Sequence, residues 1–183
     1  CSKLLEVPMN KPHLYPMTMR VMHWLMAALV LSLVFAGLTM VKSLGLWQQQ
    51  LLAWHKAMGL LAMLAIVVRL YIRLRSDTPK LPDSVPKMQQ MAAKLTQLGF
   101  YLLLFVMPIS GYLMQNAAGR PLSVFGLPLP SLLNTDLALY GLFREIHGWA
   151  ALLLVLLIVV HIIAALYHGL VKRDGVFSSM LRR

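Results

Sequence analysis

Four runs of about twenty apolar residues constrain this chain more than any other feature of its sequence. They lie at 21–40, 52–72, 95–114 and 148–171. A helix of about 20 residues, at 1.5 Å per residue, crosses the roughly 30 Å of hydrocarbon in a lipid bilayer. Of all 183 residues, 59% are hydrophobic and only 13% are charged, which excludes an ordinary soluble domain. We therefore predict an all-α integral membrane protein.

The uneven distribution of basic residues predicts how the chain is oriented. Lysine and arginine gather before the first run, between the second and third runs, and after the fourth run. The other two connections hold only Lys42, Arg120 and Arg144. By the positive-inside rule, both termini and the middle connection are cytoplasmic. The net charge of +11 then reflects this topology and attraction to anionic membrane lipid, so we predict no nucleic-acid binding.

Proline-rich and polar segments separate the runs. Residues 75–87 form a polar loop, whereas 119–136 are rich in Gly and Pro and moderately apolar, so this second segment can fold over the outer membrane face. Short links between successive helices favour an up-down-up-down arrangement. We predict one four-helix transmembrane bundle that forms a single domain over 1–183.

Five of the six histidines lie in the apolar runs or at their edges: His23, His55, His147, His161 and His168. His147 and His161 are fourteen residues apart. This spacing is close to four helical turns, so both side chains project from one face, about 21 Å apart along the axis. Two groups this far apart cannot share one metal ion, but they can mark two stacked sites.

Depth in the membrane pairs each of these histidines with one from another helix. His55 begins the second run at the outer side, level with His147, and His23 lies near the inner end of the first run, level with His161. Two such pairs, without a carboxylate or thiolate, favour haem over zinc or copper, because a porphyrin supplies the four remaining nitrogens. The single cysteine, Cys1, excludes a C-x-x-C-H attachment site. We predict two bis-histidine haems held without thioether bonds.

Basic residues are expected at the haem propionates. The segments 55–69 and 147–161 both begin with His and share "IVV" before the fifteenth residue, where Arg69 replaces the second His. Arg69 therefore lies on the face of His55 at the depth of the inner pair, and we assign it to a propionate. Further candidates are Arg20, Arg73 and Lys172 at the inner end, and Lys56 and Arg144 at the outer end.

Small residues follow the paired histidines on the same helices and leave room for a flat macrocycle: Gly59, Ala62, Ala151, Ala164 and Ala165. A single membrane histidine is more often a hydrogen-bonded packing residue than a ligand. Four at matched depths argue against that interpretation, because each buried polar group costs free energy. His168 lies near the same stripe as His161, and we expect it to contact a propionate or a quinone, or to be solvated.

Four stretches resemble the spans of the bacterial cytochrome b561 family: "RVMHWLMAALV", "HKAMGLLAMLAIVVRLYIRL", "LLFVMPISGYLM" and "VVHIIAALYHGLVKRD". The resemblance covers 16–181. It implies two haems b whose ligands match His23, His55, His147 and His161, and a location in the bacterial inner membrane. Relatives often carry His-His near the end of the last helix, where this chain has Tyr167 and His168.

The resemblance also implies electron transfer between the quinone pool and an external partner. Characterised members include a superoxide oxidase, which passes an electron from superoxide on the outer face to ubiquinone. The outer side holds more basic than acidic residues, with Lys42, Lys56, Arg120 and Arg144 against Asp136 and Glu145. Such a surface steers a small anion toward the outer haem. We therefore predict a superoxide:ubiquinone oxidoreductase.

Two other classes of function stay open at this point. One is an electron-transfer anchor, the cytochrome b subunit of a dehydrogenase or hydrogenase-type complex, which predicts purification with a soluble partner. The other is a histidine-lined metal or proton transporter, which predicts a colourless protein. In the redox interpretation the chemistry belongs to the haem iron, so no catalytic side chain is predicted.

Overall fold

The computed structural model describes residues 15–42, 45–76, 85–120, 122–124 and 127–181. Cys1, which entered the prediction on cofactor attachment, lies outside these ranges. Within them, four helices are long and apolar enough to cross a membrane. They are α1 (Met17–Lys42), α2 (Gln48–Arg75), α3 (Lys87–Ala117) and α4 (Leu137–Leu166).

Helices α1, α2 and α3 extend beyond the predicted apolar runs at both ends, whereas α4 does so only at its beginning and ends at Leu166. The first turn of α3 begins at Lys87 rather than at 95, directly after Pro86. Helix α4 begins at Leu137 rather than at 148, because the Asp136 carboxylate accepts hydrogen bonds from the N–H groups of Ala138 and Leu139 at 2.8 and 3.0 Å. A hydropathy profile detects only the part of a helix that lies in the hydrocarbon core, so it does not give the helix ends.

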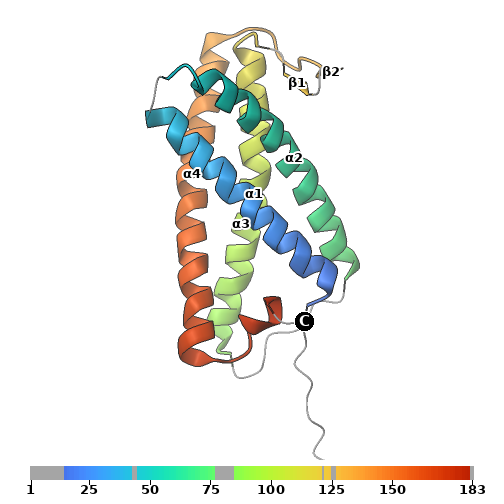
Figure 1. The fold of residues 1–183 in the computed structure, drawn as a ribbon, viewed down its shortest axis with the longest axis vertical. Helices are drawn as coiled ribbons and strands as arrows, with labels where there is room; N and C mark the ends of the chain where they lie inside the picture. Colours follow the sequence, from blue (N-terminus) through green and yellow to red (C-terminus); the bar gives the residue numbers. More distant parts are fainter. Residues whose placement is uncertain (1–14, 43–44, 77–84, 121, 125–126, 182–183) are drawn as a thin grey trace, which may run out of the picture.

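Successive helices run in opposite directions, as the short links predict (Figure 1). Helix α3 packs against α4 and against α2, and α1 packs against α2. In Figure 1, α3 and α4 stand nearly upright, whereas α1 and α2 slant across them. The predicted four-helix up-down-up-down bundle is confirmed. We call the end where α1 begins and α2 ends the inner end, and the opposite end the outer end.

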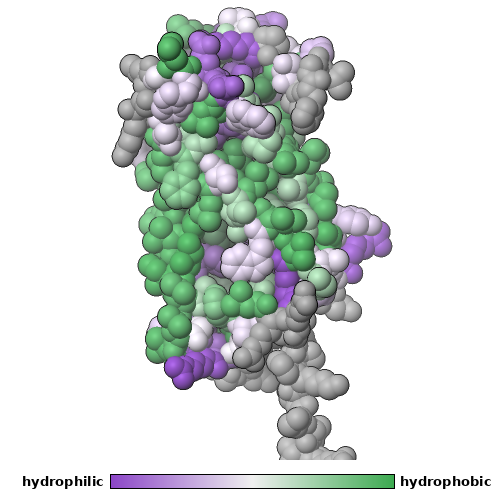
Figure 2. Space-filling model, viewed as in Figure 1, coloured by the Kyte–Doolittle hydropathy of each residue, from purple (hydrophilic) through white to green (hydrophobic). Residues whose placement is uncertain are grey.

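The surface of the bundle is apolar over its middle. Figure 2 shows a hydrophobic belt with hydrophilic residues toward both ends. Large apolar side chains along the helices are exposed, among them Phe35 and Leu153, as are the aromatic Trp24, Trp54 and Trp149. Such exposure would be unfavourable in water, but it is the normal state of side chains that face lipid. The chain is a multi-pass membrane protein.

The connection between α3 and α4 is fastened to the outer end of α3. It contains a short antiparallel hairpin, β1 (Ser123–Val124) and β2 (Leu127–Pro128), which the sequence did not predict. The buried Asn116 accepts hydrogen bonds from the Leu132 N–H at 2.6 Å and from the Ser131 hydroxyl at 3.1 Å. The Asn116 side-chain oxygen thereby accepts hydrogen bonds from Ser131 and Leu132, which lie in a segment without regular secondary structure.

The C-terminal segment folds back beneath the inner end. Helix α4 continues as a π-helix, η1 (Tyr167–Lys172), and a short 3-10 helix, η2 (Ser178–Met180), follows. The Trp24 indole N–H donates to the carbonyl of Met180 at 3.3 Å, and Lys172 Nζ donates to Gln89 Oε1 at 2.8 Å. These contacts join the segment to α1 and α3.

We expect Asn116→Ala to destabilise the folded protein by about 1–3 kcal/mol, because it removes two acceptor contacts and leaves the Leu132 N–H unpaired, whereas the Ser131 hydroxyl keeps the Leu133 carbonyl as its acceptor. The measurement is thermal unfolding of the detergent-solubilised chain, together with proteolysis of the outer connection. Asn134→Ala is the matched control, since Asn134 is exposed in the same connection. Equal unfolding temperatures for the two variants would contradict the role given to Asn116.

Candidate functional site

Two pairs of histidines stand between α4 and the helices α1 and α2. The ring centres of His55 on α2 and His147 on α4 are 6.4 Å apart. Those of His23 on α1 and His161 on α4 are 6.3 Å apart. All four side chains are partly buried. The structure thus brings together the histidines that depth had paired, one pair toward each end of the bundle, while their role as ligands stays a prediction.

These separations fit one metal ion between two imidazoles. A metal–imidazole bond is about 2.0 Å long and the bound nitrogen lies on the order of 1 Å from its ring centre, so two axial histidines have ring centres about 6 Å apart. In the part of the chain that the structure describes, no three His, Cys, Asp or Glu side chains cluster as ligands of a bare ion. The donor set therefore fits a group that brings its own equatorial nitrogens.

His147 has hydrogen-bond partners on α3 that the sequence analysis did not single out. Its Nδ1 lies 3.0 Å from the Met107 carbonyl oxygen and 3.1 Å from the Ser110 hydroxyl. The Ser110 hydroxyl also donates to the Met107 carbonyl at 3.0 Å. The only sequence signal for this contact is a serine followed by glycine inside an apolar run, in "PISG".

Two glycines on neighbouring helices lie beside the outer histidine pair. A Cβ at Gly111 on α3 would lie 3.3 Å from Cε1 and 3.5 Å from Nδ1 of His147, so the ring would have to shift by a few tenths of an ångström. A Cβ at Gly37 on α1 would lie 3.7 Å from Cε1 of His55, an ordinary contact. The predicted small residue Gly59 has open space instead, with no atom within 4 Å of such a Cβ.

The inner pair lies beside two arginines. Arg69 Nη2 on α2 is 3.3 Å from Nδ1 of His23, so the predicted depth of Arg69 at the inner pair is correct. Arg20 lies one helical turn before His23, and its Nε and Nη1 atoms are buried without a hydrogen-bond partner among the described residues. Neither arginine forms an ion pair within the described part of the chain. Two guanidinium groups in this position fit an anionic group such as a propionate.

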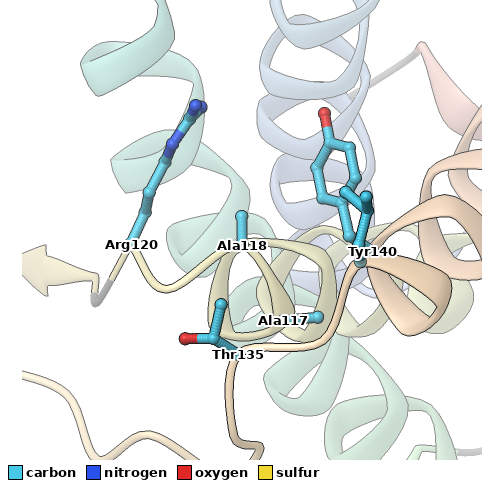
Figure 3. Close-up of a pocket in the computed structure, with 6 residues that line it drawn as sticks. Ala117, Ala118, Arg120, Thr135 and Tyr140 are labelled. Carbon is cyan, nitrogen blue, oxygen red and sulfur yellow. The ribbon is translucent and has the colours of Figure 1, made fainter.

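The predicted basic residues of the outer end differ in exposure. Lys56, next to His55, is partly buried, and Arg144, one turn before His147, is exposed. A small pocket of about 210 Å³ lies at the same end, with Arg120 and Tyr140 among its lining residues. Figure 3 shows these two side chains rising on either side of Ala118. The outer end therefore presents cationic groups at its surface.

His168 makes a contact that the sequence did not predict. Its Nδ1 is 2.6 Å from Asp174 Oδ2, and this is the one ion pair within the described residues. Burial raises the pKa of the Asp174 carboxyl, but hydrogen bonds from His168 and from the Val176 N–H outweigh it, so this pKa lies below its ordinary value of 3.8. The pair connects the end of α4 to the C-terminal segment.

Four apolar spans with paired histidines at two depths define a multi-pass membrane protein of the electron-transfer class. A family model described as prokaryotic cytochrome b561 matches residues 14–183. The chain belongs to this family, whose members are membrane electron-transfer proteins that bind haem b.

Three curated relatives are similar over most of their length. Cytochrome b561 homolog 2 of Escherichia coli strain K12 is 35% identical over 175 residues, which cover 94% of this chain and 93% of that protein. The probable superoxide oxidase CybB of Yersinia pestis is 28% identical over 166 residues, covering 87% and 90%. Cytochrome b561 homolog 1 of Escherichia coli strain K12 is 25% identical over 129 residues, covering 70% and 73%.

We expect Gly111→Ala to lower the haem content or alter the visible spectrum, because the added Cβ displaces the ring of His147. Gly99→Ala on the same helix is the matched control. There the Cβ would lie 3.2 Å from Cδ2 of Leu157, the end of a flexible side chain that can move away. Identical spectra and haem contents for both variants would show that Gly111 does not clear space for a ligand.

Proposed function

We propose that this chain holds two haems b between its helices. His55 and His147 would hold the outer haem, and His23 and His161 would hold the inner haem. The observation that carries the proposal is the separation of the ring centres, 6.4 Å and 6.3 Å, which suits one iron ion between each pair. Membership of a haem b family supports the same assignment.

The two inner arginines support the position of the inner haem. A charged arginine within a helix that spans a membrane costs about 2.5–3.5 kcal/mol near the helix centre, so it is normally paired. Arg69 and Arg20 have no acidic partner among the described residues. We infer that their guanidinium groups bind the propionates of the inner haem, and that Lys56 and Arg144 do the same at the outer haem.

We further propose that two superoxide anions at the outer end each give up one electron and leave as dioxygen, and that these two electrons, with two protons from water, reduce one ubiquinone to ubiquinol. The name of the Yersinia pestis relative, probable superoxide oxidase, supports this choice of donor. The cationic groups Lys56, Arg120 and Arg144 at the outer end support it independently, because they attract a small anion. The predicted location is the bacterial inner membrane, where the quinone pool is found.

In this function the side chains bind and orient the haems, and they perform no acid–base step. When bound, haem supplies the one-electron redox chemistry at each site. His147 and His161 place the two sites along one face of α4, Gly111 keeps space for the ring of His147, and the arginines compensate negative charge. The apolar side chains between the helices exclude water from both sites.

The first test is the visible spectrum of the purified full-length chain, air-oxidised and dithionite-reduced, with the haem content per chain. Two haems per chain and a b-type reduced spectrum are expected, followed by reduction of ubiquinone when superoxide is supplied. A colourless protein that cannot be reconstituted with haem would overturn the proposal in favour of a transporter. Haem without superoxide oxidation, and purification with a soluble dehydrogenase, would favour the anchor subunit.

We expect single alanine substitutions to remove one haem at a time. His55→Ala and His147→Ala should lose the outer haem, and His23→Ala and His161→Ala the inner haem, because each variant leaves one axial ligand. Haem content and the reduced spectrum are the measurements. His168→Ala is the matched control and should keep both haems, since His168 bonds Asp174 instead. Two retained haems in any of the four variants would refute that ligand assignment.

The double variant Lys56→Gln with Arg144→Gln should oxidise superoxide more slowly at low salt, by on the order of tenfold, because it weakens electrostatic steering. The difference should shrink at high salt, because the screening length falls from about 30 Å at 0.01 M to about 3 Å at 1 M. Lys87→Gln with Lys94→Gln is the control, since both lysines are exposed near the inner end. A rate independent of salt in all variants would exclude steering.

A further inference from the structure

The tautomer of His147 follows from its hydrogen bonds. A carbonyl oxygen can only accept, so the 3.0 Å contact between the Met107 carbonyl and Nδ1 of His147 requires a proton on that nitrogen. The Ser110 hydroxyl donates its own proton to the same carbonyl, so its oxygen lone pairs can accept the proton on Nδ1 of His147. The hydroxyl oxygen and Nδ1 are 3.1 Å apart. His147 therefore donates from Nδ1, and its Nε2 keeps a free lone pair.

The other three histidines do not have this arrangement. Arg69 can only donate, so Nδ1 of His23 accepts from it and Nε2 of His23 carries the proton, which is the opposite tautomer. The proposed ligand role of His23 therefore requires Arg69 to leave Nδ1 for the propionate and the proton to leave Nε2. Nδ1 of His55 is buried and has no hydrogen-bond partner among the described residues. His161 forms no hydrogen bond to a residue that the structure describes. Its ring packs edge-to-face on the ring of Phe100, with the ring centres 5.3 Å apart. His147 is thus the histidine whose Nε2 is already prepared to bind iron.

Helix α3 contributes this support although it carries no paired histidine. Ser110 is only 3% exposed, so its hydroxyl is held in place by packing. The adjacent Gly111 leaves the space in which the ring of His147 lies. Since a metal-binding histidine normally donates its second ring N–H to an oxygen, this arrangement is the one that orients a ligand.

We propose that Ser110, together with the Met107 carbonyl, is a positioning residue that sets the orientation and basicity of His147 and thereby the potential of the outer haem. This inference rests on the proposed role of His147 as a ligand. A hydrogen bond from Nδ1 makes the ring a stronger donor to the metal, and a stronger donor favours ferric over ferrous iron. Loss of one acceptor should therefore raise the midpoint potential of that haem alone.

The test is a spectroscopic redox titration of the full-length protein in three forms: wild type, Ser110→Ala and Ser32→Ala. Ser32 is the matched control because its hydroxyl donates to Ala28 within α1, at 2.8 Å, and meets no histidine. In Ser110→Ala, one of the two haems should titrate at a higher potential, with the other unchanged and both still bound. Ser32→Ala should titrate as the wild type does.

Repeating Ser110→Ala in chains that retain a single haem identifies the affected site. The shift should occur in the His23→Ala background, which keeps the outer haem, and should be absent in the His55→Ala background. Unchanged potentials, or equal shifts of both haems, would overturn the role of Ser110. Failure of the proposed function looks different, because the wild type itself would then lack two titrating haems.

Discussion

The position of two histidines on one face of α4 is the constraint on which the arrangement of the other helices depends. Helix α4 packs mainly on α3, whereas α1 and α2 approach it through His23 and His55. The two approaches occur at different depths, and α1 and α2 slant across the upright pair of helices, as Figure 1 shows. The imidazole pairs link α4 to these two helices, and buried apolar side chains such as Ile66 on α2 and Leu154 on α4 add to the packing.

This division explains why the bundle buries few side chains completely. In a bilayer, apolar side chains gain little by leaving lipid for the protein interior, so packing and polar contacts must hold the helices together. The hydrogen bonds of Asn116 at the outer end and of Trp24 and Lys172 at the inner end supply such contacts. These contacts fasten both ends of the bundle.

Charge follows the same two-level organisation. Arg20 stands one turn before His23, and Arg144 stands one turn before His147, so an R-x-x-H pattern marks one histidine of each pair. Neither inner arginine has an acidic partner among the described residues, and Nε and Nη1 of Arg20 are buried, whereas Arg144 is exposed. The inner end is therefore suited to hold anionic groups permanently, and the outer end to attract a small anion from solution.

Much of this protein was determined by local sequence. Runs of about twenty apolar residues have one stable form in lipid, because a helix satisfies its own backbone hydrogen bonds. A spacing of fourteen residues places His147 and His161 on one face wherever that helix packs. Depth then predicted their partners, since His23 and His55 lie at fixed heights in their own spans.

Tertiary structure decided the features that depend on contacts between helices. The sequence did not indicate that Ser110 and Gly111 face His147 or that Arg69 reaches Nδ1 of His23, because each contact requires the rotation and tilt of two helices. It also did not indicate that His168 bonds Asp174, because that contact depends on how the chain turns after η1. Nor did it show that α4 begins at Leu137, where a single carboxylate caps a helix whose beginning hydropathy alone places at 148. Periodicity and depth determine which residues lie level with one another, but only packing determines which of them touch.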